Sequence, residues 1–145
     1  ERHHIHFPGL IDELRGYIAT ADVILIEGAG GLLSPLTWSH TIVDLAKALD
    51  AQVVVVSDNR LGILNQLRLT LAQIRSHQLP MLTPVINQAR DPKAQDDDNS
   101  IRRNPGDCLR LSDVGEVLFM PYNLEPSASA ACCALLVEQI LGARR

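Results

Sequence analysis

The sequence predicts an α/β fold in which a parallel sheet carries helices on both faces. Two short apolar runs rich in β-branched residues, at residues 23–26 and 53–56, are typical of strands buried on both faces. Longer stretches with apolar residues at helical spacing lie before, between and after them. This alternation implies right-handed crossover connections and therefore parallel strands.

The expected elements follow one another regularly along most of the chain. The helices are expected over residues 9–20, 41–49, 64–76 and 127–141, and the strands over residues 23–26, 53–56, 81–87 and 114–120. Thr41 is a candidate N-cap for the second helix. Pro84 argues against a central place in the sheet, at least for its own position.

Residues 88–112 interrupt the alternation. They combine an acidic run at 96–98, an arginine pair at 102–103 and a Pro-Gly pair at 105–106. This composition predicts a long, mobile surface segment. Around it, residues 1–145 are expected to form a single α/β domain, since their number fits one domain.

Charge and composition argue against several classes of function. A formal net charge of −4 argues against a nucleic-acid partner, because such partners need a basic face. No apolar run approaches the roughly 20 residues of a membrane span. Three cysteines, two of them adjacent, make a poor disulfide framework. We therefore expect a cytoplasmic protein without a membrane partner.

The first of three notable strand ends is the turn at residues 27–31, Glu-Gly-Ala-Gly-Gly. Ligands of open parallel sheets bind at the carboxyl ends of strands, so such turns are candidate sites. Glu27 offers the hard oxygen that Mg²⁺ prefers beside phosphates. The glycines let backbone N–H groups approach an anion. The alternative is a tight turn with a surface glutamate.

The other two strand ends carry Arg60 and Asn87. Arg60 is suited to neutralise a phosphate or a carboxylate, and Asn65 to cap the next helix. A plain turn with a solvated arginine explains these residues equally well. Asn87 offers an amide donor and acceptor, which suit a purine edge. On spacing alone, a strand-ending asparagine bonded to its own backbone is the more common arrangement.

Taken together, these residues resemble the dethiobiotin synthase family. The resemblance is strongest where the apolar strand, the Glu-Gly-Ala-Gly-Gly turn and then Pro35 and Leu36 follow in order. It spans about residues 21–87 and resumes faintly at Pro121. Cobyrinate synthases of the amidotransferase type share the Glu-Gly-Ala-Gly turn and remain a close alternative.

The resemblance implies a P-loop NTPase-like fold and an ATP-dependent cyclo-ligase of biotin biosynthesis. Such enzymes close a ureido ring on the diamine 7,8-diaminononanoate, using CO₂, ATP and Mg²⁺. A carbamate forms on the diamine, is phosphorylated by ATP, and is attacked by the second amine. The family's site lies at a dimer interface, which implies a homodimer.

The family's residue roles carry over to matching positions here. Glu27 would bind Mg²⁺, and the Gly30 and Gly31 amides would face the carbamate as part of the catalytic site. The remaining roles divide between substrate and nucleotide. Substrate contacts would come from Pro35, Leu36, Arg60 and Asn65, adenine recognition from Asn87, and the lining of the base from Pro121.

The sequence departs from the family at the phosphate-binding loop. It contains no G-x-x-x-x-G-K-[S/T] motif, whose Lys and Ser/Thr hold phosphates and metal in the family. It also begins with Glu1 rather than Met. We therefore expect a C-terminal portion, incomplete at the N-terminal side of the sheet, with a partner chain that supplies the missing half. The alternative is an inactive truncated relative that serves as a binding or structural module.

Overall fold

The computed structural model describes residues 5–92, 99–111, 113–122 and 126–142. The helices in these ranges are α1 (Phe7–Ile18), α2 (Ile42–Ala48), α3 (Ile63–Ser76), α4 (Ser100–Leu111) and α5 (Pro126–Gly142). The strands are β1 (Val56–Asp58), β2 (Val85–Asn87) and β3 (Leu118–Met120). The helices expected over 41–49, 64–76 and 127–141 are confirmed within two residues at each end.

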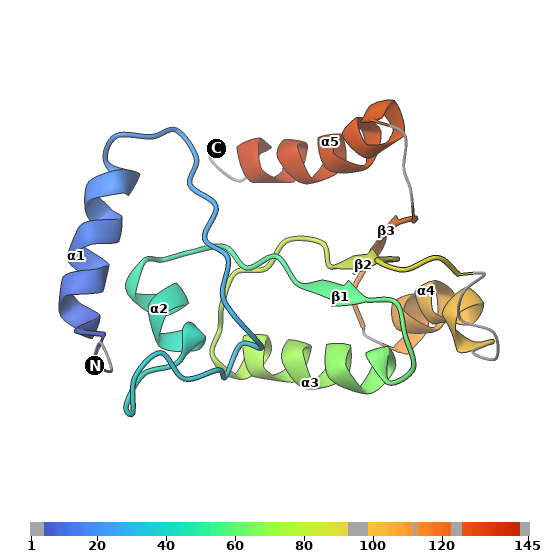
Figure 1. Ribbon diagram of the computed structural model, residues 1–145, viewed down its shortest axis with the longest axis horizontal. Coiled ribbons are helices and arrows are strands. Elements are labelled where there is room, and N and C mark those ends of the chain that lie inside the picture. Colours follow the sequence, from blue (N-terminus) through green and yellow to red (C-terminus); the bar gives the residue numbers. More distant parts are fainter. Residues whose placement is uncertain (1–4, 93–98, 112, 123–125, 143–145) are drawn as a thin grey trace.

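The described strands form a three-stranded parallel sheet in the order β1-β2-β3. The strands end together, because Asp58 pairs with Asn87 and Asn87 pairs with Met120. Figure 1 shows α3 on one face of this sheet and α5 on the other. The predicted fold class, an α/β fold with a parallel sheet between helices, is confirmed.

The hydrophobic core lies between α3, α2 and the sheet. Ile63, Leu67, Leu71 and Ile74 recur at helical spacing on α3 and are at most 3% exposed. This spacing puts one apolar stripe toward the sheet. The core also contains Val43, Ala46, Val55, Leu79, Ile86 and Cys108.

Helix α2 begins with a capping box. The backbone N–H of Thr41 and its hydroxyl both donate to Asp44 Oδ2, at 2.7 and 2.9 Å. These hydrogen bonds, the backbone one first, hold the pKa of Asp44 below its usual range. Thr41 is therefore the N-cap that its position in the sequence predicts.

Helix α3 begins differently from the prediction. Its N-cap is Gly62, in the left-handed conformation at φ +92°, and no side chain caps the helix. Asn65 instead lies inside the first turn, where it is exposed. The suggestion that Asn65 caps this helix is therefore wrong.

The strand expected over residues 23–26 is absent from the structure. Val23, Leu25 and Ile26 are 41%, 82% and 42% exposed. Figure 1 shows this segment crossing the direction of β1 rather than running beside it. None of the described strands pairs with this segment. Residues with high β-propensity form a stable strand only when a neighbouring strand pairs with them, which explains why this segment is irregular.

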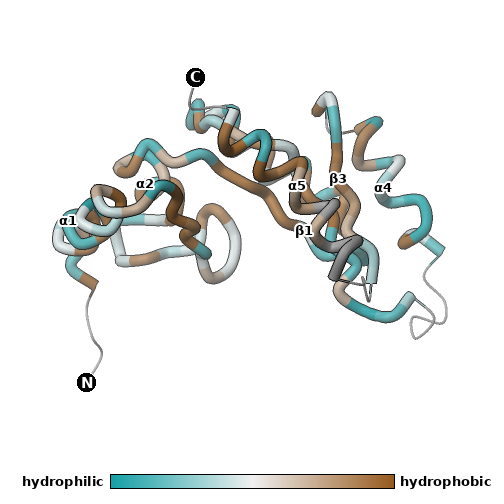
Figure 2. Tube along the Cα trace, turned by 90° about the horizontal axis from the view of Figure 1, so that it is seen from above, coloured by the Kyte–Doolittle hydropathy of each residue, from teal (hydrophilic) through white to brown (hydrophobic). Residues whose placement is uncertain are grey.

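The second apolar run forms less strand than predicted. Strand β1 starts only at Val56, and Val53 makes an isolated parallel bridge with Met81. Figure 2 shows the hydrophobic run leading into β1. Of residues 53–56, Val55 alone is buried, whereas Val56 is 63% exposed. Strand β1 lies at an edge of the described sheet.

Residues 88–112 differ most from expectation. Residues 100–111 form α4, whose Ile101, Asn104 and Cys108 are buried. The expectation of an irregular surface segment is therefore wrong for this half of the range, while residues 93–98, with the acidic run, lie outside the described residues. Spacings of three and four place the buried residues on one face of α4, which packs beside α3.

Candidate nucleotide pocket at the carboxyl edge of the sheet

A pocket of about 600 Å³ opens where the three strands end. This volume falls in the usual range for small-molecule sites, and the carboxyl edge is where open parallel sheets bind ligands. Its lining comes from the segments that follow β1 and β2, from β3 and the residues after it, and from α4. The lining residues are Asn59, Gln88, Asp91, Pro92, Ile101, Arg102, Pro105, Phe119, Pro121 and Tyr122.

Two lining residues are brought together by a backbone ladder that continues past the strands. The N–H of Asn59 donates to the carbonyl of Asn87 at 2.8 Å. The N–H of Gln88 donates to the carbonyl of Met120, also at 2.8 Å. Asn59 and Gln88 are therefore placed side by side at the pocket by the parallel register itself.

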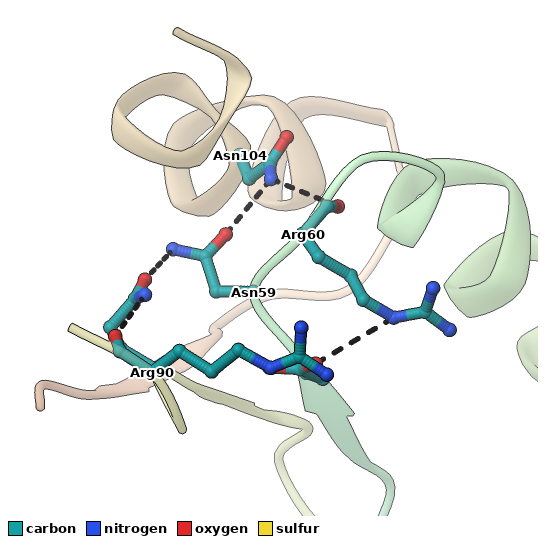
Figure 3. Close-up of polar contacts among 6 residues, drawn as sticks. Asn59, Arg60, Arg90 and Asn104 are labelled. Carbon is teal, nitrogen blue, oxygen red and sulfur yellow. Dashed lines mark hydrogen bonds and ion pairs between the residues drawn. The ribbon is translucent and has the colours of Figure 1, made fainter. Parts of the chain in front are cut away.

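Three buried amides form a hydrogen-bonded network at this pocket, and two of them line it. Figure 3 labels Asn59 and Asn104 of this network. Asn59, Gln88 and Asn104 are 1%, 4% and 3% exposed. Asn59 Nδ2 donates to Gln88 Oε1 at 2.7 Å, and Asn104 Nδ2 donates to Asn59 Oδ1 at 2.9 Å. Buried amides are stable only when hydrogen-bonded, so this network ties α4 to the ends of β1 and β2.

The network also uses a backbone carbonyl that Pro105 leaves free. Proline has no N–H, so Pro105 inside α4 cannot donate to the carbonyl of Ile101, four residues before it. Asn59 Nδ2 donates to that carbonyl instead, at 3.0 Å. A proline within a helix is thereby accommodated by a side chain from the sheet.

Arg60 and Asn87 lie at the same edge as the pocket but do not line it. Arg60 Nε is 3.6 Å from Asp58 Oδ2, and the arginine side chain is 49% exposed. Asn87 is half-buried, and its side chain makes no hydrogen bond within the part of the chain that the structure describes. Asn87 therefore keeps its full donor and acceptor capacity for a ligand.

The Glu27 turn lies elsewhere in the molecule. Glu27 is exposed and is not among the pocket-lining residues. The turn joins the start of α2, since Val43 N donates to the Leu32 carbonyl at 3.1 Å and Ile42 N to the Ser34 carbonyl at 3.2 Å. Figures 1 and 2 place α2 near one end of the molecule and α4 at the other. The structure therefore brings two of the three expected strand ends together and leaves the third apart.

The glycines of this turn are not equivalent. Gly30 has φ +87°, and a Cβ added there would collide with Ser34 Oγ. A Cβ on Gly31 would have no atom within 4 Å, so nothing in the backbone demands glycine there. Gly30 is thus explained by local geometry, whereas Gly31 is open on the side where a ligand could approach.

Pro35 and Leu36 stand in the loop between the turn and α2. Pro35 forms an antiparallel bridge with Thr41, and Leu36 N donates to the His40 carbonyl at 2.8 Å. Thr37 Oγ1 lies 2.9 Å from His40 Nδ1, which closes the loop. This ordered loop faces α2 rather than the pocket at α4.

The described residues include no group of three or more His, Cys, Asp or Glu side chains able to hold a metal ion. Magnesium commonly uses only one or two carboxylates and completes its shell with phosphate oxygens and water. Glu27 is exposed and offers one carboxylate of this kind, but it lies apart from the pocket at the sheet edge.

Asn59, Gln88, Arg102 and Asn104 are site residues that the sequence did not reveal. Asn59 resembled an ordinary turn former, and the other three lay in or beside a segment expected on the surface. The signal available in the sequence was the spacing of Ile101, Asn104 and Cys108, which places them on one face of a helix.

Comparison with known proteins agrees with the architecture. A family model described as an AAA domain matches residues 10–123, which defines a P-loop NTPase-like α/β fold. Two relatives are named ATP-dependent dethiobiotin synthetase BioD, from Anaeromyxobacter sp. (strain Fw109-5) and Anaeromyxobacter sp. (strain K). The first is 38% identical over 77% of this chain and 48% of its own length. The second is 31% identical over 99% of this chain and 61% of its own length.

A third relative of the same name, from Helicobacter pylori (strain Shi470), is 40% identical over 48% of this chain and 32% of its own length. The chain belongs to this AAA-domain family, and it is similar to the dethiobiotin synthetases over the shares given. It spans about half to three fifths of the two Anaeromyxobacter relatives. Among the described helices, none has both the length and the apolar character needed to cross a membrane.

Proposed function

We propose that this chain forms the base-binding part of an ATP site in a dethiobiotin synthetase-type ligase. The observation that carries the proposal is the 600 Å³ pocket at the carboxyl edge of the parallel sheet. Its position is the one at which this class of sheet binds nucleotides. Its walls combine apolar rings with buried amides, as sites for flat polar bases do.

The proposed reaction is the ATP-dependent closure of a ureido ring. One amine of 7,8-diaminononanoate adds to CO₂ and loses a proton, which gives a carbamate. A carbamate oxygen then attacks the γ-phosphorus of ATP, and ADP leaves. The second amine attacks the carbonyl carbon, the ring closes, and phosphate leaves as the amine loses its proton. Mg²⁺, when bound, would neutralise charge on the phosphates.

The proposal divides the residues between two regions. Beside the pocket, at the same edge of the sheet, Asn87 would bind the adenine edge, and within the pocket Pro121 would lie against the base. At the Glu27 turn, the Glu27 carboxylate would hold Mg²⁺, while the open face of Gly31 and the amide of Gly30 would meet the carbamate. Pro35, Leu36, Arg60 and Asn65 would contact the diamine.

We also propose that the working site needs a further polypeptide surface, from a homodimer partner or from the half that carries a phosphate-binding loop. One observation supports this. The apolar segment at residues 23–26 is exposed and unpaired among the described strands, with Leu25 82% exposed. Paired to another strand, this segment would carry Glu27 toward the sheet edge.

Equilibrium dialysis with Mg-ATP tests the nucleotide proposal. We expect binding in the millimolar range, weakened severalfold by Asn87→Ala and unchanged by Gln52→Ala, an exposed control outside the site. Loss of binding at all Mg-ATP concentrations up to the millimolar range would instead favour a binding or structural module without nucleotide. Glu27→Gln should leave binding by this chain alone nearly unchanged, because the Glu27 turn lies apart from the pocket.

A further inference from the structure

The buried amide network has a fixed polarity. The nitrogen and oxygen of a side-chain amide have nearly the same shape, so their partners determine which is which. Three of the partners here are backbone carbonyls, which can only accept. Asn104 Nδ2 donates to the Arg60 carbonyl at 3.3 Å, Asn59 Nδ2 to the Ile101 carbonyl, and Gln88 Nε2 to the Arg90 carbonyl at 2.8 Å.

The side-chain contacts agree with this polarity. Because each nitrogen faces a backbone carbonyl, Asn59 Oδ1 accepts from Asn104, and Gln88 Oε1 accepts from Asn59. Turning any one amide over would place two oxygens or two N–H groups against each other. The orientation of Gln88 is therefore determined by its hydrogen bonds to Asn59 and to the Arg90 carbonyl.

A count of the hydrogen bonds already made shows which donors and acceptors of the Gln88 amide remain for a ligand. Both Nδ2 hydrogens of Asn59 are used, on Gln88 and on Ile101. Gln88 uses one Nε2 hydrogen on Arg90 and one lone pair of Oε1 on Asn59. Within the described residues, one Nε2 hydrogen and one lone pair of Oε1 remain. Gln88 lines the pocket although it is only 4% exposed.

We propose that Gln88 is a specificity-determining residue that selects adenine over guanine in this pocket, with Asn59 and Asn104 as its positioning residues. The inference rests on the proposed nucleotide site. A free donor next to a free acceptor matches the adenine edge, which offers an amino donor beside a ring-nitrogen acceptor. The corresponding guanine edge offers two acceptors, so its carbonyl oxygen would face Gln88 Oε1.

The surroundings of Gln88 suit a flat ring. Phe119, Pro121 and Tyr122 line the same pocket, from β3 and the residues after it. Asn87, the residue before Gln88, is not among the residues that line this pocket. The contact proposed for Gln88 is therefore made inside the pocket, whereas Asn87 lies beside it.

The test compares AMP with GMP, so that only the base differs. Binding to the ¹⁵N-labelled chain is followed by chemical-shift titration of its backbone and side-chain amides. We expect AMP to bind about tenfold or more tightly than GMP, the size expected of one good bidentate base contact. The side-chain amide signals of Gln88 and Asn59 should move with AMP.

Two variants separate recognition from folding. Gln88→Met should bring the AMP to GMP ratio close to one, and Asn104→Leu should lower it partway by loosening the network. Gln52→Met, a glutamine exposed outside the pocket, should leave the ratio unchanged. Urea denaturation of each variant verifies that it is folded under the titration conditions.

The outcomes distinguish this inference from the proposal on which it rests. AMP binding without discrimination, or a ratio unchanged by Gln88→Met, would overturn the role of Gln88 while the nucleotide site stands. An absence of shifts around the pocket with either nucleotide would overturn both. An effect of Asn104→Leu on stability alone, with the ratio intact, would remove the positioning role.

Discussion

The two ends of this molecule differ in burial: one end buries polar side chains, and the other exposes apolar ones. At the carboxyl edge of the sheet, three amides are buried and hydrogen-bonded to one another and to backbone carbonyls. Around the Glu27 turn, an apolar β-branched segment is exposed to solvent and an acidic residue has no partner among the described residues. The first region is a candidate site formed within this chain, and the second is a surface whose strand partner the described strands do not supply.

The difference teaches that a buried polar group and an exposed apolar group are both informative departures from the usual pattern. Burial of Asn59, Gln88 and Asn104 costs free energy that only their mutual hydrogen bonds offset. Exposure of residues 23–26 forgoes hydrophobic stabilisation that a pairing strand would restore. Stability measurements should therefore separate the two regions clearly.

The largest effect is expected at Asn59. Asn59→Leu removes the partner of Gln88 Oε1, of the Ile101 carbonyl and of Asn104 Nδ2 at once. Each buried group left unpaired costs about 1–3 kcal/mol, so we expect the free energy of unfolding to fall by at least about 3 kcal/mol. Urea denaturation measures it. Asn65→Leu, on the exposed face of α3, should change it by less than about 0.5 kcal/mol.

A smaller loss is expected at Gly30. Gly30→Ala forces a side chain into a left-handed backbone conformation and against Ser34. The expected destabilisation is about 1–2 kcal/mol, measured by the same denaturation. The matched change, Gly31→Ala, meets no atom and should be nearly neutral. Equal losses at both positions would contradict the geometry of the turn.

The capping box of α2 should contribute about 1 kcal/mol, and its contribution should depend on pH. Since the folded pKa of Asp44 is lowered, the carboxylate stabilises the fold above its unfolded pKa, and this contribution is lost as pH falls through the folded pKa. Asp44→Asn should therefore lower the free energy of unfolding at neutral pH. In acid, the difference in stability between the variant and the unchanged protein should disappear. A deficit of constant size across the acid range would argue against the capping box.

The smallest effect is expected in the exposed apolar segment. Leu25 is 82% exposed, so Leu25→Ser should change the free energy of unfolding by less than about 0.5 kcal/mol. Leu67→Ala, in the core at 1% exposure, should cost about 2–5 kcal/mol as a matched comparison. A large loss at Leu25 would show that residues 23–26 are packed in solution.

Local patterns predicted much of the fold. The apolar stripe on α3 and the Thr41 cap depend on neighbours in the sequence, so spacing alone located them. The strand at residues 23–26 depends on a partner strand, which no local pattern supplies. For α4, Pro105 and Gly106 suggested a break, but Asn59 bonds the carbonyl that the proline leaves free. That contact joins residues 42 positions apart.

The residues of the candidate site also differ in whether the sequence alone could locate them. Arg60 and Asn87 could be placed at the carboxyl edge because residues at strand ends can be located from the strands, although neither lines the pocket. Their neighbours Asn59 and Gln88 became visible only when the parallel register placed them together at the pocket. A buried amide has the same sequence signature as a turn former, so burial had to be known first.

The most direct test of the account is to map where Mg-ATP binds. Titration of the ¹⁵N-labelled chain should shift the amide signals of Asn59, Gln88 and Tyr122 first, since the pocket at the carboxyl edge forms within this chain. Signals of the Glu27 turn should move less, because that turn lies apart from the pocket. Shifts confined to residues 27–36, or no shifts at millimolar Mg-ATP, would contradict the assignment of this pocket to the nucleotide.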